Sequence, residues 1–142
     1  MTAVLFIHLI AIGIWAGCVA TEAVLEVSLE KAPPLESGLA SIHSKIDRFV
    51  EIPAIIVAVA TGGSMLHLAV WDQLLSIKVS LGVAAVILNS IAAFTVHRRL
   101  QCLNAKDMAG YAKFNRWHGR IGIGCILSIA GAIVVGGHRI VS

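Results

Sequence analysis

Four long runs of mostly apolar residues fill this 142-residue chain. The runs lie at about 3–29, 52–71, 79–96 and 121–137, and charged residues separate them. A helix needs about 20 apolar residues to cross the hydrocarbon core of a bilayer, and lipid offers no hydrogen bonds to an open backbone. We therefore predict four membrane-spanning helices, at about 2–30, 43–70, 74–101 and 112–136.

The composition excludes soluble alternatives. Apolar residues make up 58% of the chain and charged residues 13%, against about 45–50% and about 25% in soluble domains. A chain this short has too much surface to bury so many apolar side chains in a soluble core. We exclude a soluble enzyme, a disordered tail and a nucleic-acid module, so the expected partner is the lipid bilayer and no nucleic acid.

The links between the runs are short. Pro33, Pro34 and Gly38 mark the first turn, Asp72 the second and the polar segment around Gly110 the third, since such residues favour turns. Sequential helices with short links are antiparallel neighbours. The expected fold is an all-α integral membrane protein, a single domain over residues 1–142 that forms an up-down four-helix transmembrane bundle.

Basic residues gather at one end of such a bundle. Of the eleven Lys and Arg residues, Lys78 and Arg139 fall at one end, and the other nine fall at the end that we call the basic end: Lys31, Lys45, Arg48, Arg98, Arg99, Lys106, Lys113, Arg116 and Arg120. Positively charged loops stay in the cytoplasm. We therefore expect a multi-pass protein of the bacterial inner membrane, with cytoplasmic basic loops and both termini periplasmic.

Ionisable residues within membrane helices are costly and point to function. At about 100° per residue, they share narrow faces of the predicted helices, which should point into the bundle. These faces hold His8, Trp15, Glu22 and Glu26; His43, Asp47 and Glu51; Lys78, Gly82, Ala85, Asn89 and Ala92; and His118, Gly122, Cys125, Ile129, Ala132 and Gly136.

The six histidines suggest haem b, whose iron takes axial ligands from facing helices, most often histidine. His8 could hold one haem together with His67, His138 or Lys78, which lie near the same level. A second haem could use His97 and His118, with His43 as a substitute. We rank His8, His97 and His118 first as ligands, and His43, His67 and Lys78 second. Two haems at two depths would carry electrons to a partner protein or a quinone.

A metal-carboxylate site is the alternative. Carboxylate and imidazole groups that project into a bundle core bind metals, and imidazole suits iron, copper and zinc. The candidate ligands all lie toward the basic end: Glu22, Glu26, His43, Asp47, Glu51, His97 and His118. Ordinary roles stay open as well, since helix-end histidines can be interfacial, Glu26 can pair with a basic residue, and Lys78 can extend to the membrane surface.

Three segments resemble a known group of membrane haem proteins. "IHLIAIGIWAG", with His8, Trp15 and Gly17, looks like the first helix of the bacterial four-helix protoporphyrinogen oxidases. "FVEIPAIIVAVATGGSML" resembles their second helix. "SIKVSLGVAAVILNSIAAFTVHRRL" is similar to their third helix, and more so to the copper-resistance D-type membrane proteins.

The resemblance implies that haem b is bound and that His8 and Lys78 are functional. The chain departs from the oxidases at "ATEAVLEVSLE" and "RWHGRIGIG". The sequence thus predicts a haem b protein for electron transfer and leaves open whether it is an enzyme. A transition-metal protein for copper, iron or zinc, a protoporphyrinogen oxidase-like enzyme and an accessory subunit of a larger complex are the alternatives, and a homo-oligomer is left open.

Overall fold

The computed structural model describes residues 2–29 and 36–141, and these residues form helices joined by turns, without strands. In chain order the elements are α1 (Thr2–Leu29), α2 (Glu36–Ile46), the short π-helix η2 (Asp47–Glu51), α3 (Ile52–Leu66), α4 (Gln73–Asn104) and α5 (Met108–Val141). The predicted all-helical fold class is confirmed. Lys31, Pro33 and Pro34 lie outside the described residues.

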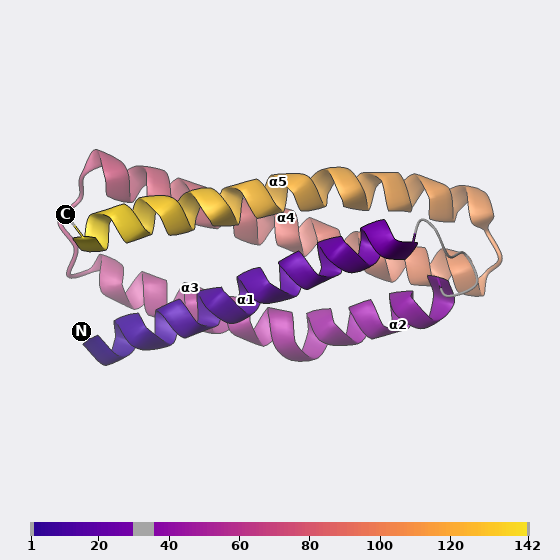
Figure 1. The fold of residues 1–142 in the computed structure, drawn as a ribbon, viewed down its shortest axis with the longest axis horizontal. Helices are drawn as coiled ribbons and strands as arrows, with labels where there is room; N and C mark the ends of the chain where they lie inside the picture. The colour runs from indigo at the N-terminus through magenta and orange to yellow at the C-terminus, as the bar shows by residue number, and fades with distance from the viewer. Residues whose placement is uncertain (1, 30–35, 142) are drawn as a thin grey trace.

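Four helical segments are long and apolar enough to cross a membrane: Ala3–Val27, Ser41–Leu66, Gln73–Asn104 and Met108–His138. The second of these is built from α2, η2 and α3, which follow one another directly. The segments alternate in direction, so the start of α1, the end of α5 and the 67–72 turn lie at one end of the bundle (Figure 1). We call it the terminal end, and the 105–107 turn lies at the other, basic end.

The bundle consists of two helix pairs. Helix α1 packs mainly against α3, and α4 packs mainly against α5 (Figure 1). The pairs meet through a central apolar cluster that includes Trp15 from α1, Ala54 from α3, Ala85 from α4 and Cys125 from α5. Between this cluster and each end of the bundle, a cavity separates the two helix pairs.

Several helix boundaries differ from the prediction. The second helical segment begins with α2 at Glu36 rather than near residue 43, so the prediction that Gly38 marks a turn is wrong and Gly38 lies in a helix. Helix α4 ends at Asn104 rather than 101, and α5 ends at Val141 rather than 136.

Two further boundaries differ from the prediction for local reasons. The second span ends at Leu66 rather than near residue 70, because Asp72 starts the next helix by accepting a 2.7 Å hydrogen bond from the Leu75 N–H at its side-chain Oδ1. The fourth helix begins at Met108 rather than 112. The turn before it is compact, since Lys106 adopts a left-handed φ of 57° and closes the end of α4.

The π-helix η2 lies directly before Pro53. The Ile52 N–H donates to the Asp47 carbonyl, five residues back, and Pro53 has no N–H with which to continue the ordinary α-helical pattern. A wide turn of this kind is frequent at functional sites. Here it carries two acidic residues into the interior, Asp47 and Glu51, which are 6% and 2% exposed.

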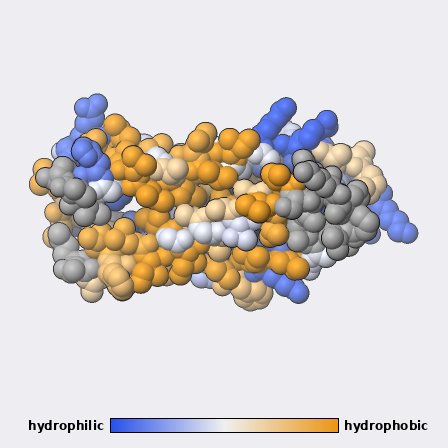
Figure 2. Space-filling model, in the orientation of Figure 1, coloured by the Kyte–Doolittle hydropathy of each residue, from blue (hydrophilic) through white to orange (hydrophobic). Residues whose placement is uncertain are grey.

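The outer surface is apolar along the middle of the molecule, and hydrophilic residues lie toward its ends (Figure 2). Large side chains such as Phe6, Ile56, Val83 and Leu127 are mostly exposed. Lipid is the environment in which such a surface is stable, because apolar side chains lose nothing by facing hydrocarbon. The arrangement is therefore that of a protein embedded in a bilayer.

Candidate functional site

Two cavities lie between the helix pairs, one toward each end of the bundle. The first, of about 450 Å³, is lined by acidic residues and histidines that include Glu22, Glu26, His43, Asp47 and His118, and we call it the acidic cavity. The second, of about 390 Å³, is lined mainly by apolar residues together with His8 and Lys78, and we call it the His8 cavity.

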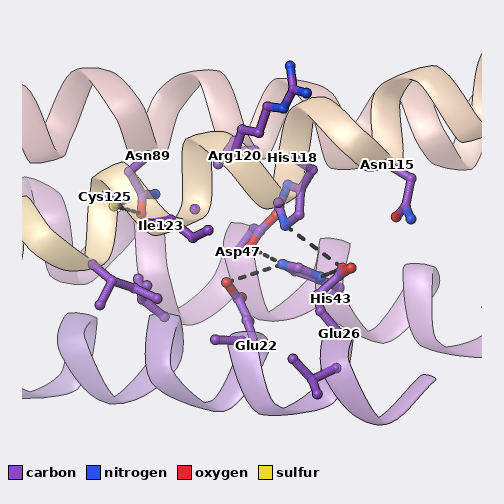
Figure 3. Close-up of a pocket in the computed structure, with 18 of the residues that line it drawn as sticks. Glu22, Glu26, His43, Asp47, Asn89, Asn115, His118, Arg120, Ile123 and Cys125 are labelled. Atoms are coloured by element: carbon purple, nitrogen blue, oxygen red, sulfur yellow. Dashed lines mark hydrogen bonds and ion pairs between the residues drawn. The ribbon is translucent and has the colours of Figure 1, made fainter. Parts of the chain in front are cut away.

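His43 lies at the centre of the acidic cavity (Figure 3). Its Nε2 is 3.1 Å from Glu22 Oε2 and 3.7 Å from Asp47 Oδ1, and its Nδ1 is 3.5 Å from Glu26 Oε1. The two glutamates are on α1, and Asp47 is one turn after His43 on η2. Both ring nitrogens therefore face carboxylates, so the histidine holds α1 and the second span together.

His118 enters the same cavity from α5. Thr95 donates a 2.7 Å hydrogen bond to the Ala92 carbonyl, which can only accept. The Thr95 oxygen, 3.0 Å from His118 Nδ1, then accepts the Nδ1 proton. The lone pair is left on Nε2, which lies 3.8 Å from Glu26 Oε1. Such a hydrogen bond to the other nitrogen is how metal-binding histidines are oriented.

Arg99 provides a buried, permanent positive charge beside the acidic cavity. Its Nη1 lies 2.6 Å from Glu26 Oε1, and the side chain is buried, with its guanidinium over the Tyr111 ring at 5.7 Å. Among the described residues, four buried side-chain atoms find no hydrogen-bond partner: Glu22 Oε1, Glu51 Oε1, Arg99 Nε and Asn115 Oδ1. Glu22, Glu51 and Asn115 line the acidic cavity, so this cavity carries unsatisfied polar groups.

His8 is fixed in a similar way at the terminal end. Its Nδ1 lies 3.0 Å from the Ala58 carbonyl and 3.0 Å from Thr61 Oγ1. Because a carbonyl can only accept, Nδ1 carries the proton in the neutral ring and Nε2 carries the lone pair. His8 is 8% exposed and lines the His8 cavity. The lone pair on its Nε2 is therefore in a largely apolar environment.

Glycines make room for both basic groups of the His8 cavity. A Cβ on Gly62 would lie 3.0 Å from His8 Cε1, and a Cβ on Gly136 would lie 3.0 Å from Lys78 Cε and 3.1 Å from its Nζ. A Cβ at either position would therefore make His8 or Lys78 shift by a few tenths of an ångström.

The structure brings most of the predicted site residues together. Glu22, Glu26, His43, Asp47, Glu51 and His118 all line the acidic cavity, and His8 and Lys78 line the other one. His97 is not among them, because it points outward from α4 and pairs with Gln101 through their Nε2 atoms at 3.0 Å. His67 and His138 are exposed and line neither cavity.

The predicted second haem has no assembled ligand pair. His97 is turned away from His118, and the substitute His43 has both nitrogens directed at carboxylates. The His43 and His118 rings are in edge-on contact, with centroids 5.3 Å apart. A flat macrocycle cannot lie between rings in contact, so this end of the bundle suits a smaller ligand.

Sequence reasoning missed Arg99, Thr95 and the Ala58 carbonyl as parts of the two sites. The sequence spacing could have indicated Arg99, because this residue lies about four helical turns after Ala85. It therefore shares the inward face of α4. The hydrogen bonds of Thr95 and of Ala58 depend on how neighbouring helices are rotated, and no pattern within one helix reveals them.

The fold and the two cavities define the class of this molecule: a multi-pass four-helix membrane protein with histidines and carboxylates buried between its helix pairs. Comparison of the chain with models of protein families, with curated proteins and with solved structures gave no match.

Proposed function

We propose that this protein binds haem b in the His8 cavity and carries electrons in the bacterial inner membrane. The observation that supports this most is the orientation of His8, whose Nδ1–H is held by the Ala58 carbonyl. A backbone bond of this kind sets the tautomer and leaves Nε2 for a metal. When bound, haem supplies a one-electron redox centre whose potential depends on the axial ligand and on burial.

The residues around His8 fit a flat apolar group. The cavity measures about 390 Å³, and its lining is mainly apolar and includes three glycines, Gly62, Gly63 and Gly82. Lys78 enters it from α4, against Gly136. Lys78 would help to hold the haem, either by ligating its iron or by pairing with one of its carboxylates. His8 would hold the group on one side and orient it toward the facing helix.

The orientation in the membrane belongs to the same proposal. Eight described basic residues are at the basic end: Lys45, Arg48, Arg98, Arg99, Lys106, Lys113, Arg116 and Arg120. The positive-inside rule assigns such an end to the cytoplasm. The His8 cavity would then lie toward the periplasm, where a redox partner protein or a quinone would exchange electrons with it.

Absorption spectroscopy tests the proposal. The protein is produced with haem supplied to the cells, purified in detergent, and its spectrum is recorded oxidised and reduced, with iron and porphyrin measured on the same sample. We expect a Soret band and about one haem per chain. His8→Ala should lose most of the haem. His67→Ala, at an exposed position outside the cavity, is the matched control and should retain it.

Two results would contradict haem binding at His8. A wild-type protein that is folded and contains neither porphyrin nor a Soret band would exclude it. A His8→Ala variant with unchanged haem content and spectrum would exclude His8 as the ligand.

A further inference from the structure

We infer that the acidic cavity is a binding site for one divalent first-row transition-metal ion. Two sets of donor atoms carry this inference: Glu26, His43 and His118 form one, and Glu22, His43 and Asp47 form the other. Within each set the donor atoms lie within 4.8 Å of one another. Ligands about 2.1 Å from an ion lie at most about 4.2 Å apart, so small side-chain rotations would bring either set onto one ion.

Unsatisfied buried oxygens point to a ligand independently of the cluster. Glu22 and Glu51 are 8% and 2% exposed, and within the described structure Oε1 of each has no hydrogen-bond partner. Both residues line the acidic cavity. A buried carboxylate oxygen is unfavourable without a donor or a cation, and an ion in this cavity would supply the missing interaction.

The charge balance favours a cation. Glu22, Glu26, Asp47 and Glu51 bring four carboxylates to this cavity, and the buried Arg99 brings one permanent positive charge, already paired with Glu26. Arg116 and Arg120 also line the cavity, but both are exposed. Counted against the buried Arg99 alone, the ionised carboxylates would exceed the permanent positive charge by three. A divalent ion would balance two of these charges at the place where they converge.

The orientation of His118 suits a metal ligand. Its Nδ1 proton goes to Thr95, and its Nε2 lone pair lies toward Glu26 and the His43 ring. The donors come from α1, from the second span and from α5 (Figure 3). An ion held by them would join both helix pairs, so binding should also stabilise the fold.

The donor set selects the kind of ion. Mixed imidazole and carboxylate ligands suit Zn²⁺, Fe²⁺ and Mn²⁺, whereas Cu⁺ prefers thiolate and thioether sulfur. Cys125 also lines the cavity, but its thiol is directed to the Ala85 carbonyl and to Asn89 Oδ1. We therefore assign a divalent ion and expect Cu⁺ to bind weakly.

Manganese and zinc serve as probes. The whole protein is purified, stripped with a chelator, exchanged into chelator-free buffer and titrated with Mn²⁺, with free Mn²⁺ followed by electron paramagnetic resonance. Zn²⁺ is then added as a competitor. We expect one Mn²⁺ per chain, displaced by Zn²⁺, and a higher melting temperature with either ion. His118→Ala and Glu22→Gln should each weaken Mn²⁺ binding about tenfold or more.

Matched variants separate this site from the proposed haem. His97→Ala, at an exposed residue of α4 that does not line the acidic cavity, should leave Mn²⁺ affinity unchanged. His8→Ala, in the other cavity, should leave it unchanged as well. If His118→Ala does not fold, Glu22→Gln carries the test, because it keeps the shape of the side chain. Failure to bind Mn²⁺ or Zn²⁺ at millimolar concentration would overturn the inference. Equal binding by wild type and Glu22→Gln would overturn it as well.

Discussion

The indole Nε1 of Trp15 donates a 3.0 Å hydrogen bond to Asn89 Oδ1. Trp15 lines the His8 cavity and Asn89 lines the acidic cavity, so this bond between α1 and α4 lies at the boundary of the two. Cys125 on α5 directs its thiol to the same oxygen at 3.5 Å. Asn89 thus joins three helices and separates an apolar cavity from a polar one.

Loss of this bond should destabilise the bundle. Trp15→Phe removes the indole N–H and should lower the free energy of unfolding by about 0.5–2 kcal/mol, the range for hydrogen bonds between membrane helices. A double-mutant cycle with Asn89→Ala separates the bond from the change in ring size. Trp71→Phe, at a residue that is 60% exposed, is the control and should have little effect. A coupling energy of zero would show that the bond contributes nothing.

A methyl group at Gly62 should disturb His8. The added Cβ would lie 3.0 Å from His8 Cε1, whereas a Cβ on Gly13, an exposed residue outside the cavity, meets nothing within 4 Å. We expect Gly62→Ala to lower haem retention or shift the reduced absorption spectrum and the midpoint potential, because the His8 ring must move. Gly13→Ala should match the wild type. Identical spectra and potentials for the two variants would argue against His8 as a haem ligand.

Helical phase predicted much of the interior from sequence. His8, Trp15 and Glu22 were assigned to one inward face of the first helix, and their exposures are 8%, 5% and 8%. The method works because an apolar membrane helix with one polar stripe has a single favourable rotation. His43 and Asp47 followed the same rule and are buried too.

The prediction of ligand residues was incomplete where a residue was chosen only by its level along the bundle axis and its rotation around the helix was ignored. His97 lies at the right level for His118, but it comes twelve residues after Ala85, which places it about 120° away around α4. Arg99, two residues later, is the one that turns inward and reaches Glu26. The bond from His118 to Thr95 depends on the relative rotation of α4 and α5, which only the packed structure shows.

Thr95 should influence metal binding without touching the metal. Thr95→Val removes the oxygen that accepts the His118 Nδ1 proton and keeps the shape of the side chain. Loss of such a supporting hydrogen bond typically costs about 10–100-fold in metal affinity, which the Mn²⁺ titration measures. Thr21→Val is the control, because Thr21 is exposed and its hydroxyl bonds the carbonyl of Gly17 in its own helix. Equal losses in the two variants would indicate a general effect on folding.

The turn between α4 and α5 offers a stabilising substitution. Lys106 has a φ of 57°, and the turn is closed by hydrogen bonds from Lys106 N–H to the Leu103 carbonyl and from Asp107 N–H to the Cys102 carbonyl, at 3.1 and 2.9 Å. This pattern normally carries glycine at the left-handed position, because other residues are strained there. Lys106→Gly should therefore raise the free energy of unfolding by about 0.5–1 kcal/mol.

A second lysine provides the comparison for that turn. Lys113 is exposed within α5, where glycine is less favourable than ordinary helix-forming residues by about 1 kcal/mol. Lys113→Gly removes the same charge at the same end of the bundle and should lower stability, while Lys106→Gly raises it. Opposite signs in a denaturant or thermal unfolding series would establish the backbone effect. A loss of stability in both variants would mean that the lysine charge, rather than the backbone at residue 106, decides the result.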